Sequence, residues 1–393
     1  MRVLITGTTY HPAHNGQAVF TTHLAEGLAR RGHEVTVVAP MLPGERRCDE
    51  RNGVAVHSLR AISLGRWHPD AAVPLLPSGA LREIMATARP EVVHVHDHYP
   101  LSRLAARLAR RFGARLIGTN HFVPDNLKPY LPARRYLGSA YERLLWWWML
   151  GLYNRLDAVT APSATAVSIL LENGLRTPAR AISCGVDVAR FRPMEDLDRA
   201  AMRRRYGLDE SAILCLYVGR LDGEKGIDVL LRALRLLPRH DVSLGIVGKG
   251  AARAALEGLA EHAGLGARAR FLGFVPDEDL PALLNSADLF AMPSSAELLS
   301  IATLEAMACG RPILAARARA LPELVTEGEN GRLFGPADAA DAARALAALV
   351  AEPQRWRAMG AESRKRAMAH ALDDMVRCYE DVYQHTWSHV RSG

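Results

Sequence analysis

The stretch Ile-Leu-Cys-Leu-Tyr-Val-Gly-Arg-Leu-Asp-Gly-Glu-Lys-Gly, residues 213–226, decides the fold class of this chain. Residues 213–218 form an apolar run without polar alternation, which is typical of a strand buried on both faces of a parallel sheet. The glycine-rich turn that follows opens a helix. Ligands of open α/β sheets bind at the carboxyl ends of the strands, where Arg220 and Lys225 stand. The alternative is a solvated turn without function.

The same alternation of short strands and helices extends in both directions from this stretch. We expect further strands at 2–6, 34–39, 92–95, 116–118, 158–161, 181–183, 242–247, 270–272, 289–291 and 313–315. A charged segment, 187–207, separates the two series. The pattern predicts an α/β protein with two Rossmann-like, doubly wound parallel-sheet domains facing a central cleft. Their expected bounds are 1–186 and 208–370, with 187–207 as a linker.

Composition narrows the function classes. The chain has 393 residues and a net charge of +7, compatible with a phosphorylated ligand, an anionic membrane or nucleic acid. Its five cysteines form no C-x-x-C pair, which argues against a disulfide framework or a cysteine zinc site and favours a reducing compartment. The longest apolar stretch, 144–153, is about half of the ~20 residues that a membrane helix needs.

Two glutamates eight positions apart mark a second loop. Glu297 lies before a predicted helix, and Glu305 lies inside it among apolar residues. A carboxylate on so apolar a helix needs a partner such as a ligand hydroxyl, unless it simply faces solvent. The backbone N–H groups of residues 300–302 would be free at the helix N-terminus, a geometry that binds anions.

Two weaker signals lie elsewhere. The glycine-containing strand ends at 247–250 and 271–275 could let a ligand approach the backbone, or be simple turns. His94, His96 and His98 would share one face of an extended chain and suggest a metal site, but polar lining of a sheet edge is the preferred interpretation.

Taken together, these motifs resemble the retaining GT-B glycosyltransferases of glycosyltransferase family 4. The family's E-x₇-E signature matches Glu297 to Glu305, and the sequence at 305–312 continues it. The motif G-R-x-x-x-x-K-G matches 219–226, and residues 322–333 also fit. The N-terminal half agrees more loosely, through a strand, a loop containing Gly16 and the first helix. The resemblance covers nearly the whole chain.

The resemblance implies a role for each matching residue. Arg220 and Lys225 would bind the diphosphate of a nucleotide-sugar donor, Glu305 the ribose hydroxyls, and Glu297 the transferred sugar. The other implied contacts are the backbone of Ser300, Ile301 and Ala302 for sugar and phosphates, Val275 for the base, Gly16 for a close approach to the phosphates, and His121 as the active-site histidine. No metal or resident cofactor is implied, because cations and helix dipoles take the metal's place. Residues 371–393 would pack back on the first domain.

The implied reaction moves a hexose from a UDP- or GDP-linked donor to a hydroxyl with retention at the anomeric carbon. Arg220, Lys225 and the helix N-terminus would stabilise the departing diphosphate. The sequence departs from the family pattern at Asn15, where a glycine is usual, at 298–300, where Phe-Gly is usual, and at 319–321, where two glycines are usual. These departures leave the donor sugar open.

The acceptor is the less determined part of the hypothesis. Arginines beside Trp146, Trp147 and Trp148 in the segment 131–155 resemble a helix on an anionic membrane, which favours a lipid acceptor such as diacylglycerol. The alternative is a buried packing helix, since three adjacent tryptophans point in different directions. A soluble acceptor, such as a natural-product aglycone or a polysaccharide, stays open. We expect a cytoplasmic protein, peripheral on the inner face of the membrane if the acceptor is lipid.

Rival classes explain less of the sequence. A dinucleotide-binding dehydrogenase would need glycines where Tyr10 and His11 stand. A non-catalytic basic protein that binds membrane or nucleic acid would explain the charge, but not two carboxylates and two cations at strand ends. We therefore expect no nucleic-acid partner.

Overall fold

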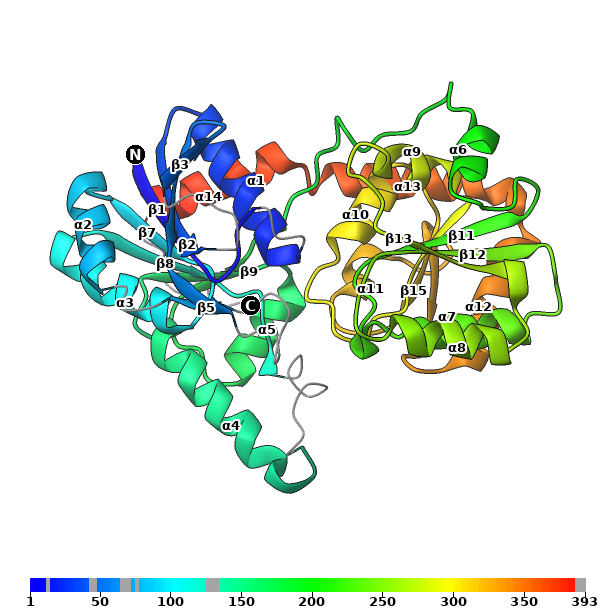
Figure 1. Ribbon diagram of the computed structural model, residues 1–393, viewed down its shortest axis with the longest axis horizontal. Helices are drawn as coiled ribbons and strands as arrows, with labels where there is room; N and C mark the ends of the chain where they lie inside the picture. Colours follow the sequence, from blue (N-terminus) through cyan, green and yellow to red (C-terminus); the bar gives the residue numbers. More distant parts are fainter. Residues whose placement is uncertain (12–14, 42–47, 64–71, 75–77, 125–133, 386–393) are drawn as a thin grey trace. The chain divides into compact units, whose positions relative to one another are not determined.

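The computed structural model describes residues 1–11, 15–41, 48–63, 72–74, 78–124 and 134–385. The chain forms two compact units (Figure 1). The first comprises Met1–Gly185 and Leu372–Gly393, and the second comprises Val186–Ala371. Each unit is built on a parallel sheet with helices against it, which confirms the expected fold class of two Rossmann-like α/β domains.

The first unit contains an eight-stranded sheet with the order β10-β9-β8-β7-β1-β2-β4-β3. Its strands are β1 (Arg2–Thr6), β2 (Glu34–Pro40), β3 (Cys48–Arg51), β4 (Val54–Leu59), β7 (Val92–Val95), β8 (Arg115–Thr119), β9 (Ala158–Ala161) and β10 (Ala179–Ala181). Strand β3 pairs antiparallel with β4, and the other neighbours are parallel. A separate two-stranded sheet joins β5 (Ala61–Ser63) and β6 (Ala72–Pro74).

The helices of this unit follow the strands as the alternating pattern predicts. They are α1 (Gly16–Arg30), α2 (Ser78–Ala88), α3 (Pro100–Ala109), α4 (Arg134–Tyr153), α5 (Ala164–Glu172) and α14 (Leu372–Gln384). Asn15 begins α1, because its side-chain oxygen accepts the N–H of Ala18 at 2.9 Å. Residues 131–133 of the tryptophan segment lie outside the described part of the chain.

Helix α14 packs into the first unit although it comes last in the sequence. Tyr383 OH lies 2.8 Å from Nδ1 of His94, and Tyr379 OH lies 3.0 Å from Oγ1 of Thr160. A Cβ atom on Gly27 of α1 would lie only 2.5 Å from the side chain of Val376, so α1 and α14 are in close contact. Residues 372–385 thus supply part of the first unit's buried interior.

The second unit contains a six-stranded parallel sheet with the order β13-β12-β11-β14-β15-β16. The strands are β11 (Ile213–Val218), β12 (Val242–Val247), β13 (Ala269–Gly273), β14 (Leu289–Met292), β15 (Ile313–Ala316) and β16 (Gly331–Phe334). Five of them match the expected ranges within one residue, and β16 was not expected. Strands β11 and β14 are neighbours in the sheet although β12 and β13 separate them in sequence. This reversal of strand order creates a topological switch point, where α/β sheets bind ligands.

Helices cover both faces of the second sheet (Figure 1). They are α6 (Arg199–Arg205), α7 (Ile227–Leu236), α8 (Arg253–His262), α9 (Leu280–Ser286), α10 (Ile301–Ala308), α11 (Leu321–Leu324), α12 (Ala339–Ala351) and α13 (Trp356–Met368). Helix α7 packs with α12 and α8, whereas α10 packs with α13 and α9.

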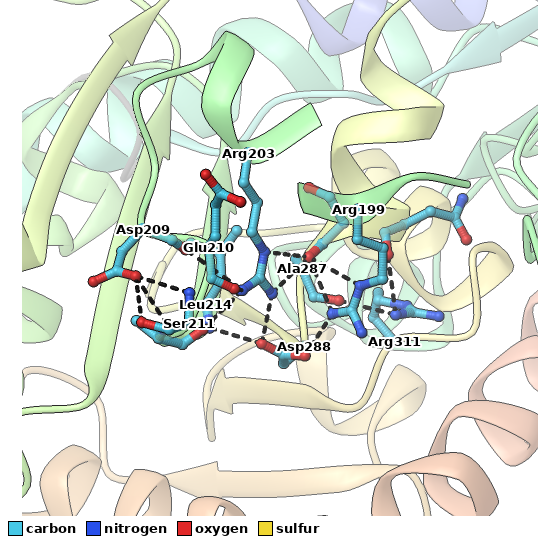
Figure 2. Close-up of polar contacts among 12 residues, drawn as sticks. Arg199, Arg203, Asp209, Glu210, Ser211, Leu214, Ala287, Asp288 and Arg311 are labelled. Atoms are coloured by element: carbon cyan, nitrogen blue, oxygen red, sulfur yellow. Dashed lines mark hydrogen bonds and ion pairs between the residues drawn. The ribbon is translucent and has the colours of Figure 1, made fainter. Parts of the chain in front are cut away.

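Residues 187–207, for which we expected a linker, lie within the second unit. Figure 2 shows the reason: Arg203 of α6 is buried and reaches the start of β14. Its Nη2 donates to Asp288 Oδ2 at 2.8 Å, and the same oxygen accepts the N–H of Leu214 at 2.8 Å. Arg199 Nη2 donates to the carbonyl of Ser286 at 3.0 Å. These contacts fix the segment to the amino ends of β11 and β14.

One expected strand is displaced. We expected residues 181–183 to form a strand, but the ladder to β9 uses residues 179–181, because Ala179 lies opposite Val159 and Ala181 opposite Ala161. The short, partly exposed strand carries too little apolar periodicity to set its own register.

Candidate active site

Two loops of the second unit meet at the switch point between β11 and β14. The β11 loop leaves the sheet at Gly219, whose φ of +158° lies at the edge of the region that favours glycine. Two hydrogen bonds hold the backbone of this loop in place. The Gly219 N–H donates to the carbonyl of Val247 at 3.0 Å, and the Leu221 N–H donates to the carbonyl of Lys249 at 2.9 Å. The side chains of this loop therefore project from a rigid backbone.

Lys225 is the central cation of this arrangement. Its Nζ donates to Glu297 Oε1 at 2.7 Å and lies 3.6 Å from Glu224 Oε1. Burial acts to lower the pKa of Lys225, but the carboxylates of Glu297 and Glu224 outweigh it and raise that pKa. The lysine is therefore charged at neutral pH and held beside two acids.

Arg220 is the second cation. It contacts the carboxylate of Asp222, and its Nη2 donates to Glu224 Oε1 at 3.1 Å. Its side chain is one-third exposed (34%), more than that of Lys225 (16%). Two cations with charge-assisted bonds at a sheet edge suit recognition of a diphosphate.

The second loop leads from β14 into α10. Ser300 caps that helix, since its Oγ accepts the Thr303 N–H at 3.2 Å. Ser300 is buried, and Ile301 and Ala302 are half-buried in the first turn. The structure thus places the three expected residues at a helix N-terminus, where backbone N–H groups attract anions.

Glu305 lies one turn further along α10. Burial raises its pKa to about 8; Arg190 acts to lower the pKa, and Asp277 acts to raise it. A carboxyl group in this state exchanges protons near neutral pH and can accept hydrogen bonds from ligand hydroxyls when ionised.

Val275 follows β13 at the same edge of the sheet. Its side chain is buried, whereas the neighbouring Phe274 is about half exposed (49%). Lys249 Nζ lies 5.3 Å from the centre of the Phe274 ring. Both residues lie in the glycine-containing strand ends 247–250 and 271–275 that were weak candidates from the sequence, but the contact between them was not expected.

Gly16 and His121 belong to the first unit. A Cβ atom on Gly16 would meet no described atom within 4 Å, so packing among the described residues does not require a glycine at this position. The residue stands at the first turn of α1, directly after the Asn15 cap.

His121 follows β8 by two residues. Its ring centre lies 4.6 Å from that of Phe20 and 5.8 Å from that of His96. Burial lowers the pKa of His121 to about 3. Its Nε2 is buried and has no hydrogen-bond partner among the described residues. A neutral imidazole with one unpartnered nitrogen can serve a ligand hydroxyl as donor or acceptor.

Two other histidines of this region, His94 and His96, form hydrogen bonds within the first unit. His96 Nδ1 lies 2.7 Å from Oγ1 of Thr21, and His94 Nε2 lies 2.7 Å from Oγ1 of Thr119. The His98 ring packs on Tyr99 instead. Within the described ranges, no group of three or more His, Cys, Asp or Glu side chains is arranged to hold a metal ion.

Two acids of the β11 loop were not among the candidate residues. Asp222 and Glu224 form ion pairs with Arg220 and Lys225, and their presence between these two cations in the motif was the available signal. The motif by itself indicates ligand-binding roles for its cations and none for its acids.

Two family models match the chain and together span most of it. A model described as "Glycosyltransferase Family 4" matches residues 14–190, and one described as "Glycosyl transferases group 1" matches residues 198–366.

Curated relatives match along most of their length. A GDP-mannose-dependent alpha-(1-6)-phosphatidylinositol monomannoside mannosyltransferase of Mycolicibacterium smegmatis is 34% identical, over 86% of each chain. A D-inositol 3-phosphate glycosyltransferase of Rhodococcus jostii is 31% identical, over 93% of this chain and 84% of its own.

Solved structures share the fold at lower identity. A sucrose-phosphate synthase from Thermosynechococcus elongatus aligns with a TM-score of 0.81 at 23% identity, covering 97% of this chain and 98% of its own. The glycosyltransferase WaaG aligns with a TM-score of 0.73 at 20% identity, covering 97% and 99%.

Proposed function

The chain belongs to glycosyltransferase family 4, the retaining enzymes of the GT-B fold, and from this membership we propose that it transfers a hexose from a UDP- or GDP-linked donor to a hydroxyl of an anionic membrane lipid. Hexosyl transfer follows from the family. The donor, the acceptor and the residue roles are our proposal.

The observation that carries the proposal is the ionic cluster at the β11–β14 switch point. Lys225 and Arg220 supply two positive charges beside the N-terminus of α10. A leaving diphosphate gains negative charge as its bond to the anomeric carbon breaks. Fixed cations and oriented N–H groups stabilise that charge without reorganisation.

The carboxylates of Glu297 and Glu305 are suited to bind hydroxyl groups of the donor. Glu297, whose side chain is largely buried (13% exposed), is suited to bind hydroxyls of the transferred sugar and to offset the positive charge that develops on it. Glu305 is suited to the ribose hydroxyls. The bond from the acceptor oxygen to the anomeric carbon forms on the face that the diphosphate leaves, and the acceptor proton passes to the departing phosphate.

The proposed acceptor rests first on the names of the relatives. One is named for a phosphatidylinositol mannoside acceptor, and others for D-inositol 3-phosphate. Both acceptors carry an inositol ring and a phosphate. We therefore favour an inositol phosphate headgroup over the neutral diacylglycerol that the sequence had suggested.

Helix α4 supports a membrane-borne acceptor. Trp147, Leu144 and Trp148 are exposed to 69%, 58% and 40%, whereas Met149 and Tyr153 are buried. The helix therefore packs with one side and leaves Leu144, Trp147 and Trp148 exposed, so it is not wholly a buried packing helix. We call Leu144, Trp147 and Trp148 the tryptophan patch.

One arginine packs on the tryptophan patch. The guanidinium carbon of Arg103 lies 3.9 Å from the Trp148 ring centre. Further exposed arginines lie on α3, on α4 and just beyond each helix: Arg107, Arg110, Arg111, Arg143 and Arg155. Exposed tryptophan and leucine beside basic side chains favour peripheral binding to an anionic surface. No described helix is long and apolar enough to span a bilayer.

The test is nucleotide release from a panel of UDP-, GDP- and ADP-sugars. Each donor is offered with phosphatidylinositol vesicles, with phosphatidylcholine vesicles, and with soluble inositol phosphate. We expect one donor to turn over with phosphatidylinositol vesicles. Turnover only with soluble inositol phosphate, the second candidate favoured by the Rhodococcus relative, would remove the lipid from the proposal.

A variant pair isolates the tryptophan patch. W147A/W148A should lose most vesicle-dependent turnover while retaining binding of the nucleoside diphosphate. The control is L171A, which removes another half-exposed leucine (50%) from the same unit. Equal vesicle-dependent rates in the two variants would contradict the assigned membrane contact.

A further inference from the structure

The ionic cluster at the switch point contains more negative than positive charges. Its five members are Asp222, Glu224, Glu297, Arg220 and Lys225. Three acids and two bases sum to a charge of −1. A negatively charged donor diphosphate therefore meets cations that are already paired with acids. For the diphosphate to bind, one of the acids must release Arg220 and Lys225.

Glu224 is the acid that both cations share. Its Oε1 accepts from Arg220 Nη2 at 3.1 Å and lies 3.6 Å from Lys225 Nζ. In the described part of the chain, Asp222 pairs with Arg220 alone and Glu297 with Lys225 alone. Removal of either cation from Glu224 thus changes the surroundings of the other.

The second oxygen of Glu224 is buried and, among the described residues, unpaired, which makes the loss of the cationic partners energetically more unfavourable. The side chain is 9% exposed, and its Oε2 is buried without a hydrogen-bond partner among the described residues. A buried carboxylate that loses a cationic partner has little solvent to stabilise its charge, so the loss is unfavourable. Glu224 therefore pulls Arg220 and Lys225 back when they turn toward a ligand.

We propose that Glu224 is a positioning residue that competes with the diphosphate for Arg220 and Lys225 and thereby speeds release of the nucleoside diphosphate product. This inference rests on the proposed function, since it takes the two cations as the diphosphate site. In this role Glu224 acts through Arg220 and Lys225 rather than by contact with the sugar or the phosphates. Its carboxylate sets how tightly its two partners hold the product.

The experiment measures binding and dissociation of UDP, GDP and ADP with the full-length protein, by calorimetry and stopped-flow. E224Q keeps the shape of the side chain and removes its charge. We expect about ten-fold tighter binding of the preferred nucleoside diphosphate and correspondingly slower dissociation. E224D restores the charge and should return the affinity toward that of the wild type.

A matched control removes one negative charge at a position outside the ionic cluster. D228N neutralises an acid four residues away, whose partner Arg232 is a surface arginine at 3.6 Å, and should leave the affinity within about two-fold. Thermal unfolding of each variant checks that the fold is intact.

The outcomes separate this inference from the proposed function. Tighter binding by E224Q, reversed in E224D, supports competition. Wild-type binding with unchanged or weaker binding by a folded E224Q would overturn the inference and leave the proposed function standing. No binding of any nucleoside diphosphate by the wild type would overturn both.

Discussion

The ammonium group of Lys225 and the carboxylate of Glu297 form a 2.7 Å ion pair across 72 residues of sequence. Both side chains are largely buried, at 16% and 13% exposed. The pair forms because β11 and β14 are neighbours in the sheet, so the loops that follow them meet at one edge. Each residue is thus the other's main counter-charge at the proposed donor site.

We expect K225A and E297A each to reduce turnover by at least about 10²-fold, because the first removes a cation from the leaving group and the second removes the proposed sugar contact. The measurement is nucleotide release at saturating donor, with circular dichroism to check the fold. K365A is the matched lysine control, since Lys365 is 78% exposed on α13. Near-normal turnover in both site variants would contradict the assignment.

Glu305 makes the second unit less stable at alkaline pH. Burial raises its folded-state pKa to about 8, so the folded state binds a proton that the unfolded state has lost. Between the unfolded pKa of about 4.3 and pH 8, stability therefore falls as pH rises, by at most about 1.4 kcal/mol per pH unit.

Urea unfolding of the wild type at pH 6 and pH 8 should show this loss. E305Q, which cannot ionise, should show less of it. The same difference between the two pH values in both proteins would remove Glu305 as its source.

Buried histidines give the first unit the opposite pH response. Burial lowers the pKa of His94 and His121 to about 3 and that of His98 to about 4. A lowered histidine pKa means that stability is fully present above the unfolded value of about 6.5 and is lost as pH falls toward 4. At pH 5 each histidine costs roughly 2 kcal/mol.

H98F tests this response on a single residue. The His98 ring lies among Tyr99, Phe122 and Tyr153, and its Nδ1 is buried without a described hydrogen-bond partner, so a phenyl ring suits the site. Fluorescence of the α4 tryptophans should show a smaller loss of stability between pH 7.5 and pH 5 in H98F than in the wild type. Equal losses would exclude His98 from the response.

D288N should destabilise the second unit by about 3 kcal/mol, because it leaves the buried guanidinium of Arg203 without its carboxylate. Urea unfolding measures the change. The control is D241N, whose partner Arg239 is 43% exposed, and its effect should stay within about 0.5 kcal/mol. Similar losses in both variants would contradict a buried role for Arg203 (Figure 2).

The central strands were predictable because parallel strands buried on both faces appear as uninterrupted apolar runs. Strands β11 and β12 occur where those runs lie. Strand β3, with the sequence Cys-Asp-Glu-Arg, was not predictable, because its register is set by antiparallel pairing with β4 rather than by its own apolar residues.

The identity of the site residues was predictable from the sequence, but the contacts between them were not. The sequence selected Arg220, Lys225 and Glu297 because cations and acids at strand ends suit a diphosphate and a sugar. It did not show that Lys225 bonds to Glu297, since that contact depends on strand order. Nor did it show that Glu224 lies against both cations, since that depends on the path of the loop after β11. The linker expectation shows the same limit, because the buried position of Arg203 depends on Asp288, 85 residues away.

The position of α14 has a consequence for biosynthesis. Residues 1–185 of the first unit are made before the second unit, yet Tyr379 and Tyr383, whose hydroxyls join its buried polar interior, are made after it. A ribosome therefore finishes the entire second unit before the first can close. During that interval the imidazole of His94 lacks its partner Tyr383, so loss of α14 should destabilise the first unit rather than the second, although α14 follows the second unit in sequence.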